Sequence, residues 1–489
     1  MSKLFFLSAS LVAAVSLSVN PAFAADNPPA PSGPQTDGAF RKVILDTDRE
    51  VNGKWEDTVK DPMELAVAPD GRVFYAQRDG TIKMWKPETK TTVVIADIPV
   101  FTGLEEGMLG VTLDPNFAKN GWIYLNHSLP ETTTDAHGQK AGIIRVSRYT
   151  LAGDSIDLGS EKKMLDTVVQ REQCCHVGGS LAFDSQGNLY ASAGDNTNPF
   201  ASDGYAPIDE QPGRSPWDAQ KSAANPNDLR GKVNRIHPEP DGTYTIPKGN
   251  LFPAGTPGTR PEIYVMGCRN PFRIAIDQRT GYLYWGEVGP DAGGPNPNRG
   301  PAGFDEINQA RKAGFFGWPY FIADNKAYIK YDFAAKVSGT PFNPIQPVNN
   351  SPNNTGARNL PPAQPAFIYY TYGPSTKFPV VNGGGGRTAM AGPVYYFDPG
   401  VKSEHKLPKD FDHTLFIYEW SRNWITAVHL DTDDHIGKME RFCGHMTFKR
   451  PMDMELGPDG CLYLIEFGTA WGNNLDSQIV RIEHDGPQS

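Results

Sequence analysis

The sequence predicts an all-β protein made of repeated sheet units, the organisation of a β-propeller. Its 489 residues include 50 Gly, 43 Pro and 11% aromatic residues, a composition typical of turn-rich β proteins. A strand–turn–strand pattern recurs along the chain, as expected for radially repeated sheets. Helical periodicity is weak, and residues 304–312 are its best candidate. A large propeller can use such a length as one domain.

Each copy of the repeat joins an apolar strand to an aromatic-bearing strand through a turn that usually contains Gly. Four close copies and two looser ones share this pattern; they begin at Leu65, Leu181, Ile274 and Met454, and at Val111 and Asp410. In a propeller the ends of the innermost strands face a central channel, and ligand residues collect at one mouth. Copies that end in Arg78, Asp195 or Glu287 should therefore bring charged side chains to that mouth.

The first 24 residues have the organisation of a cleavable signal peptide. Lys3 supplies the positive charge, Leu4–Val19 the apolar segment and Ala22–Ala24 the small-residue cleavage site. No later stretch is apolar over about 18 residues, so the sequence predicts no membrane span. The mature chain is expected to be periplasmic or secreted.

The remaining chain is predicted to form a single domain. Residues 25–45 are expected to be a flexible lead-in, since this segment begins with many Pro, Gly, Ser and Asn residues. Residues 46–489 then form the propeller. Insertions near 196–228 and 324–386 are long, irregular and rich in Asn, Pro and Gly, which is typical of lids and binding loops.

Charge and cysteine content narrow the class further. A formal net charge of −10 argues against a nucleic-acid partner and against a polybasic membrane patch. Five cysteines in an exported protein can form disulfides, with one left over if two pairs form. Cys443 and Cys461 are the expected pair. The neighbours Cys174 and Cys175 either form a vicinal disulfide or remain thiols.

The segment from Gln173 to Asp195 is the first candidate for chemistry. His176 precedes two glycines and a predicted hairpin whose second strand ends in Asp195. The hairpin returns the Asp195 carboxylate towards the imidazole, which is the minimal arrangement of an oriented general base. A histidine at a strand end is, taken alone, more often structural.

Six motifs occur in a fixed order, and together they are specific. They are EEGMLGVTLDPNF (105–117), HVGGSLAFDSQGNLYASAGD (176–195), GCRNPFRIAID (267–277), GEVGPD (286–291), DEINQARKAGFFGWP (305–319) and RPMDMELGPDGCLYL (450–464). This succession resembles the soluble quinoprotein glucose/sorbosone dehydrogenases, the PQQ-dependent aldose sugar dehydrogenases, over residues 60–485. The resemblance implies a six-bladed β-propeller of four-stranded antiparallel blades, with PQQ and Ca2+ at the central mouth.

The resemblance also implies a catalytic and cofactor-binding set. His176 matches the base, Asp195 the carboxylate that orients it, and Arg269 a group that stabilises developing oxyanion charge. The residues that match contacts of the cofactor are Glu105, Arg269, Asn270, Arg422 and Arg450. Arg422 enters this set as one of three side chains, with Arg387 and Lys449, that could replace missing positive charge.

Metal ligands follow from the same resemblance. The backbone carbonyls of Gly289 and Pro290 match ligands of a calcium ion beside the cofactor. Asp305 and Glu306, with the carbonyl of Phe316, match a second, structural calcium site. Each motif also has a plain structural reading, such as a helix cap at Asp305–Glu306, a turn at Gly289–Pro290 or a solvated loop at Glu105–Glu106.

Three positions depart from the family pattern. Cys175 stands where glucose-specific members carry an acidic residue, Ser421 where a lysine pairs with the cofactor, and Met452 where a second arginine holds a carboxylate. Each lost charge-assisted contact with the anionic cofactor should weaken its binding by about 1 kcal/mol or more.

The sequence thus favours a dehydrogenase that oxidises the anomeric carbon of an aldose to a lactone. His176 would take the hydroxyl proton, hydride would pass to PQQ, and electrons would leave to a soluble acceptor such as a cytochrome. Two alternatives stay open. One is a non-catalytic propeller that binds carbohydrate or protein, and the other is a calcium-dependent sugar lactonase.

Overall fold

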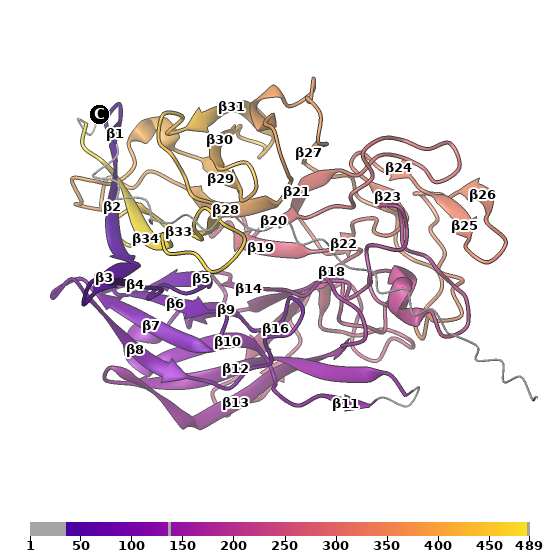
Figure 1. Ribbon diagram of the computed structural model, residues 1–489, viewed down its shortest axis with the longest axis horizontal. Helices are drawn as coiled ribbons and strands as arrows, with labels where there is room; N and C mark the ends of the chain where they lie inside the picture. The colour runs from indigo at the N-terminus through magenta and orange to yellow at the C-terminus, as the bar shows by residue number, and fades with distance from the viewer. Residues whose placement is uncertain (1–35, 135–137, 487–489) are drawn as a thin grey trace, which may run out of the picture.

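The computed structural model describes residues 36–134 and 138–486, and its sheets are the six blades of a β-propeller (Figure 1). Blade 1 consists of β5 (Pro62–Val67), β6 (Val73–Gln77), β7 (Thr81–Lys86) and β8 (Thr91–Asp97). Blade 2 consists of β9 (Met108–Leu113), β10 (Trp122–Ser128), β12 (Lys140–Ala152) and β13 (Ser155–Gln170). Blade 3 consists of β14 (Gly178–Phe183), β15 (Leu189–Ala193), β16 (Lys232–Pro238) and β18 (Ile263–Met266). The innermost strand of each blade contacts that of the next.

Blades 4 to 6 repeat this order. Blade 4 consists of β19 (Pro271–Ile276), β20 (Leu283–Glu287), β21 (Asp305–Ala310) and β27 (Ile368–Tyr370). Blade 5 consists of β28 (Ala389–Tyr395), β29 (Thr414–Glu419), β30 (Trp424–Leu430) and β31 (Ile436–Phe442). Blade 6 consists of β32 (Pro451–Leu456), β33 (Leu462–Glu466), β34 (Gln478–His484) and β2 (Phe40–Thr47). The predicted fold class, six four-stranded antiparallel blades, is confirmed. Further short strands extend these sheets or pair beside them: β1 (Thr36–Asp37), β3 (Arg49–Val51), β4 (Lys54–Glu56), β11 (Thr133–Thr134), β17 (Tyr244–Thr245) and β22 (Gly314–Phe315).

The two ends of the described chain close the ring. β2 pairs antiparallel with β34, so that Phe40 lies opposite His484 and Thr47 opposite Gln478, and the two strands lie side by side in Figure 1. The described part of the expected lead-in, residues 36–45, is therefore largely paired strand and not flexible. Phe40, Ile44 and Leu45 of this segment pack against the core cluster that contains the strands of blade 6, which the composition of the preceding segment did not indicate.

Five of the six repeat copies coincide with the inner hairpin of a blade. The copy that begins at Asp410 is shifted by one strand, because it covers β29 and β30 while the innermost strand of that blade is β28. A long connection between Tyr395 and Thr414 separates β28 from β29. Because these two strands are not joined by a short turn, the strand–turn–strand pattern did not identify them as a hairpin.

The helix expected over 304–312 is wrong. Residues Asp305–Ala310 form β21, which is almost wholly buried between β20 and β27. Within the described ranges the α-helix is α1 (Phe117–Asn120), a single turn between β9 and β10. No helix in this part of the chain has the length and apolar character needed to span a membrane.

The two insertions pack against each other at one end of the long axis (Figure 1). The first contains the 3-10 turns Ser215–Trp217 and Ala219–Lys221. The second contains β24 (Lys326–Ala327), β25 (Ile329–Asp332), β26 (Val337–Pro341) and the 3-10 turn Pro379–Val381, and β23 (Phe321–Ile322) lies just before it and pairs with β24. Asn349 donates to the carbonyls of Gln220 and Ala224 at 2.8 and 3.0 Å. Ser351 donates to Asp218 at 2.5 Å. The insertions therefore form one layer.

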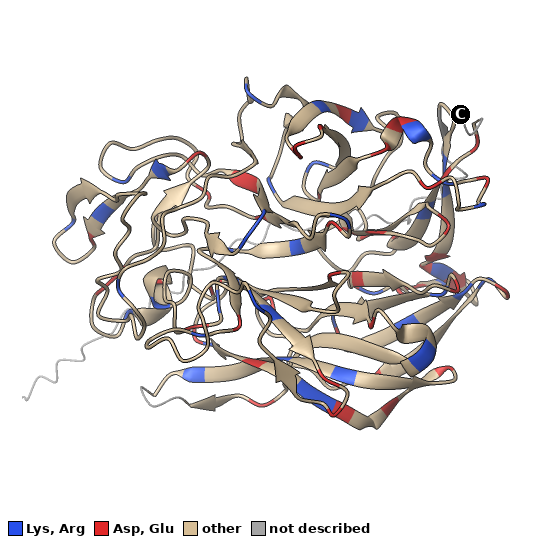
Figure 2. Cartoon of the chain, turned by 180° about the vertical axis from the view of Figure 1, so that it is seen from behind, with Lys and Arg blue, Asp and Glu red and all other residues tan. Residues whose placement is uncertain are grey.

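Charged groups are also buried where the blades meet. The Arg273 guanidinium is fully buried and donates to the carbonyls of Met452, Phe272 and Met63. Asp453 lies 3.5 Å from it, and Glu64 accepts the N–H of Val111 at 2.8 Å. These contacts join residues of blades 1, 2, 4 and 6. Elsewhere basic and acidic residues are interspersed along the blades (Figure 2).

Candidate active site

The candidate site is built from the loops that precede the innermost strands. His176, Arg269 and Arg387 each lie two residues before such a strand, in blades 3, 4 and 5. Glu105 precedes β9 and Arg450 precedes β32. Because all innermost strands run in the same direction through the ring, these side chains come together at one end of the channel. The repeat itself therefore creates the mouth.

His176 is held by Glu105 from the neighbouring blade. Its Nδ1 lies 3.0 Å from Glu105 Oε1, and its Nε2 is buried with no hydrogen-bond partner among the described residues. Burial opposes the charge of Glu105, but His176 and Arg269 outweigh it and lower the pKa of this carboxyl. The pair is a carboxylate-oriented imidazole with one open nitrogen.

Asp195, expected to orient the imidazole, has other hydrogen-bond partners in the structure. The hairpin does bring this segment beside the imidazole, since Asn196 N–H donates to the His176 carbonyl at 3.0 Å. The Asp195 side chain instead accepts Trp318 Nε1–H at 2.7 Å and the N–H of Thr197 at 3.2 Å. Burial raises the pKa of Asp195 to about 6, although His176 and Arg269 oppose this shift.

The loop that carries Glu105 is fixed by buried ion pairing, so the plain reading of Glu105–Glu106 as a solvated loop fails for Glu106. Arg171 binds both carboxylate oxygens of Glu106 at 2.9 and 2.7 Å, and both side chains are almost fully buried. Gly142 leaves the space for this guanidinium, because a Cβ there would lie 2.1 Å from Arg171 Cζ. Arg78, expected at the mouth, donates to the carbonyls of Thr102, Leu104 and Glu106.

Replacing Arg171 with Met is expected to lower the free energy of unfolding by about 3–5 kcal/mol, because Glu106 would stay buried without its cation. Urea denaturation of the variant and the wild type measures this difference. Arg145→Met is the matched control: it removes a more exposed pair with Asp166 and should cost at most about 1 kcal/mol. Equal losses in the two variants would show that the buried pair does not hold the loop.

In blades 4, 5 and 6 the second strand ends in a glutamate, and this glutamate fixes the loop that precedes the innermost strand of the same blade. Glu287 accepts the N–H groups of Arg269, at 2.7 Å, and of Asn270. Glu419 accepts the N–H of Thr388, and Glu466 that of Lys449 at 3.0 Å. Glu287, expected as a charged group at the mouth, thus positions the backbone of Arg269 and Asn270. The Asn270 side chain accepts the N–H of Gly178 at 3.2 Å and links blades 3 and 4.

These carboxyls predict how stability depends on pH. Burial raises the pKa of Glu287 from 4.5 to about 8, although the N–H groups that it accepts oppose this shift. The folded state therefore binds a proton that the unfolded state releases, so the free energy of unfolding should fall between pH 4.5 and about 8. The contribution of Glu287 is about 1.4 kcal/mol per pH unit in this range. Denaturation curves across the range measure it, and Glu287→Gln should reduce the slope by that amount. An unchanged slope would contradict the prediction.

Arg422, expected to contact the cofactor, binds the backbone of neighbouring loops. Its guanidinium donates to three backbone carbonyls, those of Gly386, Val381 and Thr371, at 2.8–3.0 Å. Lys449 is paired with Asp476 at 3.5 Å. Both side chains therefore hold loops of blades 5 and 6 in the structure.

Arg450 and the two departing positions complete the account of blades 5 and 6. The Arg450 guanidinium lies over the Trp420 and Trp471 rings at 4.3 and 5.1 Å and donates to the Thr469 carbonyl at 3.3 Å. Ser421 shares a hydrogen bond with Thr388 at 2.7 Å. The Met452 side chain is buried in the hydrophobic core. Arg422 and Arg450, the expected arginines of these blades, both have intermediate burial.

The residues expected to hold calcium beside the cofactor do not fit that ion. The Pro290 carbonyl accepts a hydrogen bond from Arg387 Nη2 at 2.7 Å, so a cation already lies on this ligand. The Gly289 N–H donates to Asp305 at 3.1 Å. Calcium takes six to eight oxygen ligands, and a guanidinium beside one of them opposes its binding by charge.

The second expected calcium site is not formed either. Asp305 accepts the N–H groups of Gly289 and Ala389, and Glu306 accepts the N–H of Ala323 and the side-chain amide of Asn308. Phe316 packs edge-on against Trp285 with ring centroids 4.7 Å apart. Each carboxyl oxygen therefore faces an N–H donor, and Asp305–Glu306 begin a strand instead of capping a helix.

The cysteines lie partly in the site. Cys174 and Cys175 form a vicinal disulfide directly before His176. Cys175 Sγ lies within 4.8 Å of ligand atoms of Glu105 and His176, but a disulfide sulfur is not the thiolate that metals bind. The expected Cys443–Cys461 bond is wrong: both are buried thiols in the structure. They lie on separate segments of blades 5 and 6, and sequence order gave no measure of their separation.

Four side chains near the mouth were not singled out in the sequence. Trp318 binds Asp195 and packs edge-on against Tyr328, whose buried hydroxyl has no partner in the described part of the chain. Asp291 accepts the Tyr372 hydroxyl at 3.0 Å and lies 3.6 Å from Arg269 Nη2. The position of Asp291 directly after Pro290 was the available signal.

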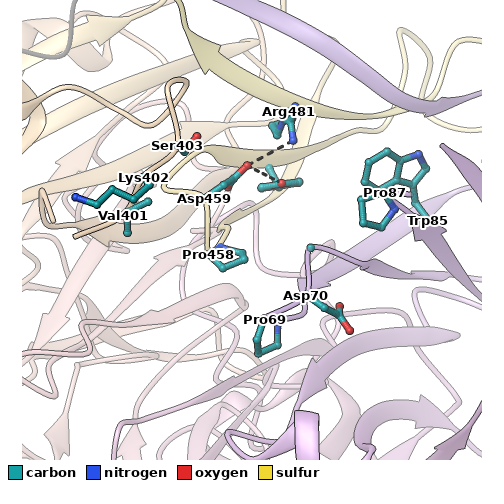
Figure 3. A pocket seen from close by; sticks show the side chains of 12 residues that line it. Pro69, Asp70, Trp85, Pro87, Val401, Lys402, Ser403, Pro458, Asp459 and Arg481 are labelled. Atoms are coloured by element: carbon teal, nitrogen blue, oxygen red, sulfur yellow. Dashed lines mark hydrogen bonds and ion pairs between the residues drawn. The ribbon is translucent and has the colours of Figure 1, made fainter. Parts of the chain in front are cut away.

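A hollow at the opposite end of the channel serves as a contrast (Figure 3). Its lining comes from turns that follow the innermost strands, including Asp70, Lys402 and Asp459. Asp459 there accepts the Tyr463 hydroxyl at 3.0 Å and lies 3.5 Å from Arg481. Its acidic groups are already paired, and none of the predicted site residues lines it.

The buried polar atoms of the mouth match an acceptor-rich guest. Arg387 Nε and the Tyr328 hydroxyl, which are both donors, are buried without hydrogen-bond partners among the residues described. PQQ, which carries three carboxylates and two quinone oxygens, offers acceptors to such donors. The residues present therefore fit this group.

Comparisons with known proteins agree with this geometry. The family model described as glucose / sorbosone dehydrogenase matches residues 59–344. The chain belongs to the glucose/sorbosone dehydrogenase family. The resemblance drawn from the ordered motifs is thereby confirmed.

Relatives of this glucose/sorbosone dehydrogenase family member are distant. Quinoprotein glucose dehydrogenase B of Acinetobacter calcoaceticus is 25% identical over 514 residues, covering 100% of this chain and 98% of that protein. Aldose sugar dehydrogenase YliI of Escherichia coli is 27% identical over 266 residues, 54% of this chain and 60% of that protein. The PQQ-bound aldose sugar dehydrogenase of Streptomyces coelicolor shares the fold, with a TM-score of 0.52, 18% identity and coverage of 92% and 99%.

Proposed function

We propose that this family member is a PQQ-dependent dehydrogenase that oxidises the anomeric carbon of an aldose sugar to a lactone. The observation that carries the proposal is the His176–Glu105 pair, whose open Nε2 is buried in the same cluster as Arg269. Family membership supports the coarser statement, a sugar dehydrogenase of the PQQ type.

The roles of the protein groups follow from their contacts. With Nδ1–H donated to the Glu105 carboxylate, Nε2 of His176 is an acceptor and takes the proton of the anomeric hydroxyl. Glu105 then stabilises the imidazolium that forms. The Arg269 guanidinium, held by the Val288 carbonyl at 2.8 Å, places positive charge beside the pair and favours anionic groups of the guest. PQQ, when bound, supplies the hydride acceptor.

Reconstitution tests this function. The purified chain is mixed with PQQ and supplied with a panel of aldoses, and reduction of an artificial electron acceptor is followed. We expect aldose-dependent reduction that needs PQQ. If no sugar of a broad panel gives turnover and PQQ does not bind, the dehydrogenase proposal fails.

The setting of the enzyme belongs to the same proposal. Residues 1–24, outside the described part of the chain, have the pattern of a signal peptide, and we propose a periplasmic or secreted enzyme that passes electrons to a soluble acceptor such as a cytochrome. The amino-terminal sequence of the exported protein checks the cleavage after Ala24.

A non-catalytic propeller is the second candidate, and the departing positions favour it. Ser421 and Met452 supply no charge to a guest, and the Arg422 guanidinium donates to backbone carbonyls of neighbouring loops. Carbohydrate binding that His176→Asn leaves unchanged, without turnover, would support this reading. A lactonase lacks such support, because the expected calcium ligands face N–H donors and the described acidic cluster His405–Glu483–Asp485 already contacts Arg41.

A further inference from the structure

Arg387 occupies a special place among the arginines of the mouth. It precedes β28 by two residues, as His176 precedes β14 and Arg269 precedes β19. Its side chain is only 1% exposed. One face of the guanidinium lies over the Tyr372 ring, with Cζ 4.0 Å from the centroid. The repeat therefore delivers a desolvated cation to the same end of the channel as the candidate base.

The Arg387 guanidinium contacts the groups expected to bind calcium, namely the Pro290 carbonyl and the Asp305 carboxylate. Nη2 donates to the Pro290 carbonyl at 2.7 Å, and Nη1 lies 3.4 Å from Asp305 Oδ1. Gly303 permits this arrangement, because a Cβ there would lie 1.6 Å from the Pro290 oxygen and 3.1 Å from Arg387 Nη2. The carbonyl expected to bind calcium is thus satisfied by the chain itself.

Arg387 still has capacity for an anion. Its Nε is buried with no hydrogen-bond partner in the described ranges. The carboxylate that lies 3.4 Å from Nη1, that of Asp305, also accepts the N–H groups of Gly289 and Ala389. A guanidinium can bind a carboxylate through two parallel N–H groups, so it can replace a cation as the partner of such a group.

A carboxylate already lies between the arginines of this cluster. Asp291 is 3.6 Å from Arg269 Nη2 and accepts the hydroxyl of Tyr372, the ring on which Arg387 stacks. Its side chain is 57% exposed. A solvent-accessible carboxylate is therefore accommodated beside Arg269 and Tyr372.

We propose that Arg387 takes the place of the calcium ion, and that the chain binds a carboxylate of its quinone cofactor through this guanidinium without a divalent cation. This inference rests on the proposed function, since it concerns the same guest. It gives Arg387 the role of a positive charge that binds the cofactor. Such a charge compensates for the lysine and the arginine that the family carries at the positions of Ser421 and Met452.

Isothermal titration of PQQ into the full chain tests the inference without measuring turnover. The protein is freed of metal with EDTA and titrated in EDTA and, separately, in excess calcium. We expect the two dissociation constants to agree within about twofold, a difference below 0.5 kcal/mol that reports no linked ion. Binding that needs calcium, or tightens tenfold or more with it, would overturn the inference while leaving the proposed function intact. An absence of PQQ binding in both buffers would instead refute the proposed function.

Variants locate the effect. Arg387→Met should weaken PQQ binding about 10- to 100-fold, as expected for a lost charge-assisted contact. The matched control is Arg279→Met, which removes an exposed arginine that lies over Tyr396 at 3.8 Å, in a turn at the other end of the blade; it should leave affinity unchanged. Thermal unfolding verifies that each variant is folded. An affinity for Arg387→Met equal to that of the wild type would refute the role, and the EDTA comparison on the wild type stands if this variant does not fold.

Discussion

Replacing His176 with Asn should lower the turnover number for aldose oxidation by about 10²- to 10⁴-fold, the usual contribution of a positioned general base. The imidazole is the group at the mouth that combines an open nitrogen with a carboxylate partner, because Nδ1 binds Glu105 and Nε2 has no partner among the described residues. Asparagine is close in size but cannot accept the proton at neutral pH. Steady-state rates with saturating PQQ measure the loss.

The affinity for PQQ separates catalysis from folding in this experiment. Titration should give a dissociation constant for His176→Asn within a few-fold of the wild-type value, since the principal cationic contacts remain. His435→Asn, in an exposed turn of blade 5, is the control and should leave both quantities unchanged. Undiminished turnover in His176→Asn would remove this residue from the mechanism.

Replacing Arg273 with Met should lower the free energy of unfolding by about 3–5 kcal/mol, the effect of removing one partner from a buried ion pair. Arg273 donates to carbonyls of blades 1, 4 and 6 and lies 3.5 Å from Asp453. Without the guanidinium, these carbonyls and the buried carboxylate would lose their donors. Guanidinium chloride denaturation measures the change.

The control for this experiment is Arg49→Met, because Arg49 is exposed on β3. Its effect should stay within about 0.5 kcal/mol. A loss of similar size in the two variants would mean that the buried arginine does not hold the blades together. A broadened transition in Arg273→Met would indicate that blades unfold separately.

Sequence reasoning was accurate where the signal is local or ordered along the chain. The strand–turn–strand copies predicted the inner hairpins, because alternation of apolar residues and turn chemistry act over a few residues. It failed where long insertions separate partners. The inner strand β28 and the closing strand β2 were missed because their sheet neighbours are distant in sequence.

Side-chain partners were the other limit. The hairpin correctly placed Asp195 next to His176, but the direction of its carboxylate depends on Trp318 from an insertion. The absence of a lysine at position 421 suggests the neighbouring Arg422 as a cofactor ligand. In the structure the Arg422 guanidinium donates to three backbone carbonyls. Charge alone does not reveal whether a guanidinium is already satisfied.

The sequence by itself determined the family, the repeated blade and the presence of an imidazole at the start of blade 3, since these depend on residue order and short-range periodicity. The tertiary structure alone decided that the His176 imidazole contacts the Glu105 carboxylate and that Arg387 donates to the Pro290 carbonyl. Both contacts join neighbouring blades. Their geometry is set by how the sheets pack around the channel, which no local pattern of residues encodes.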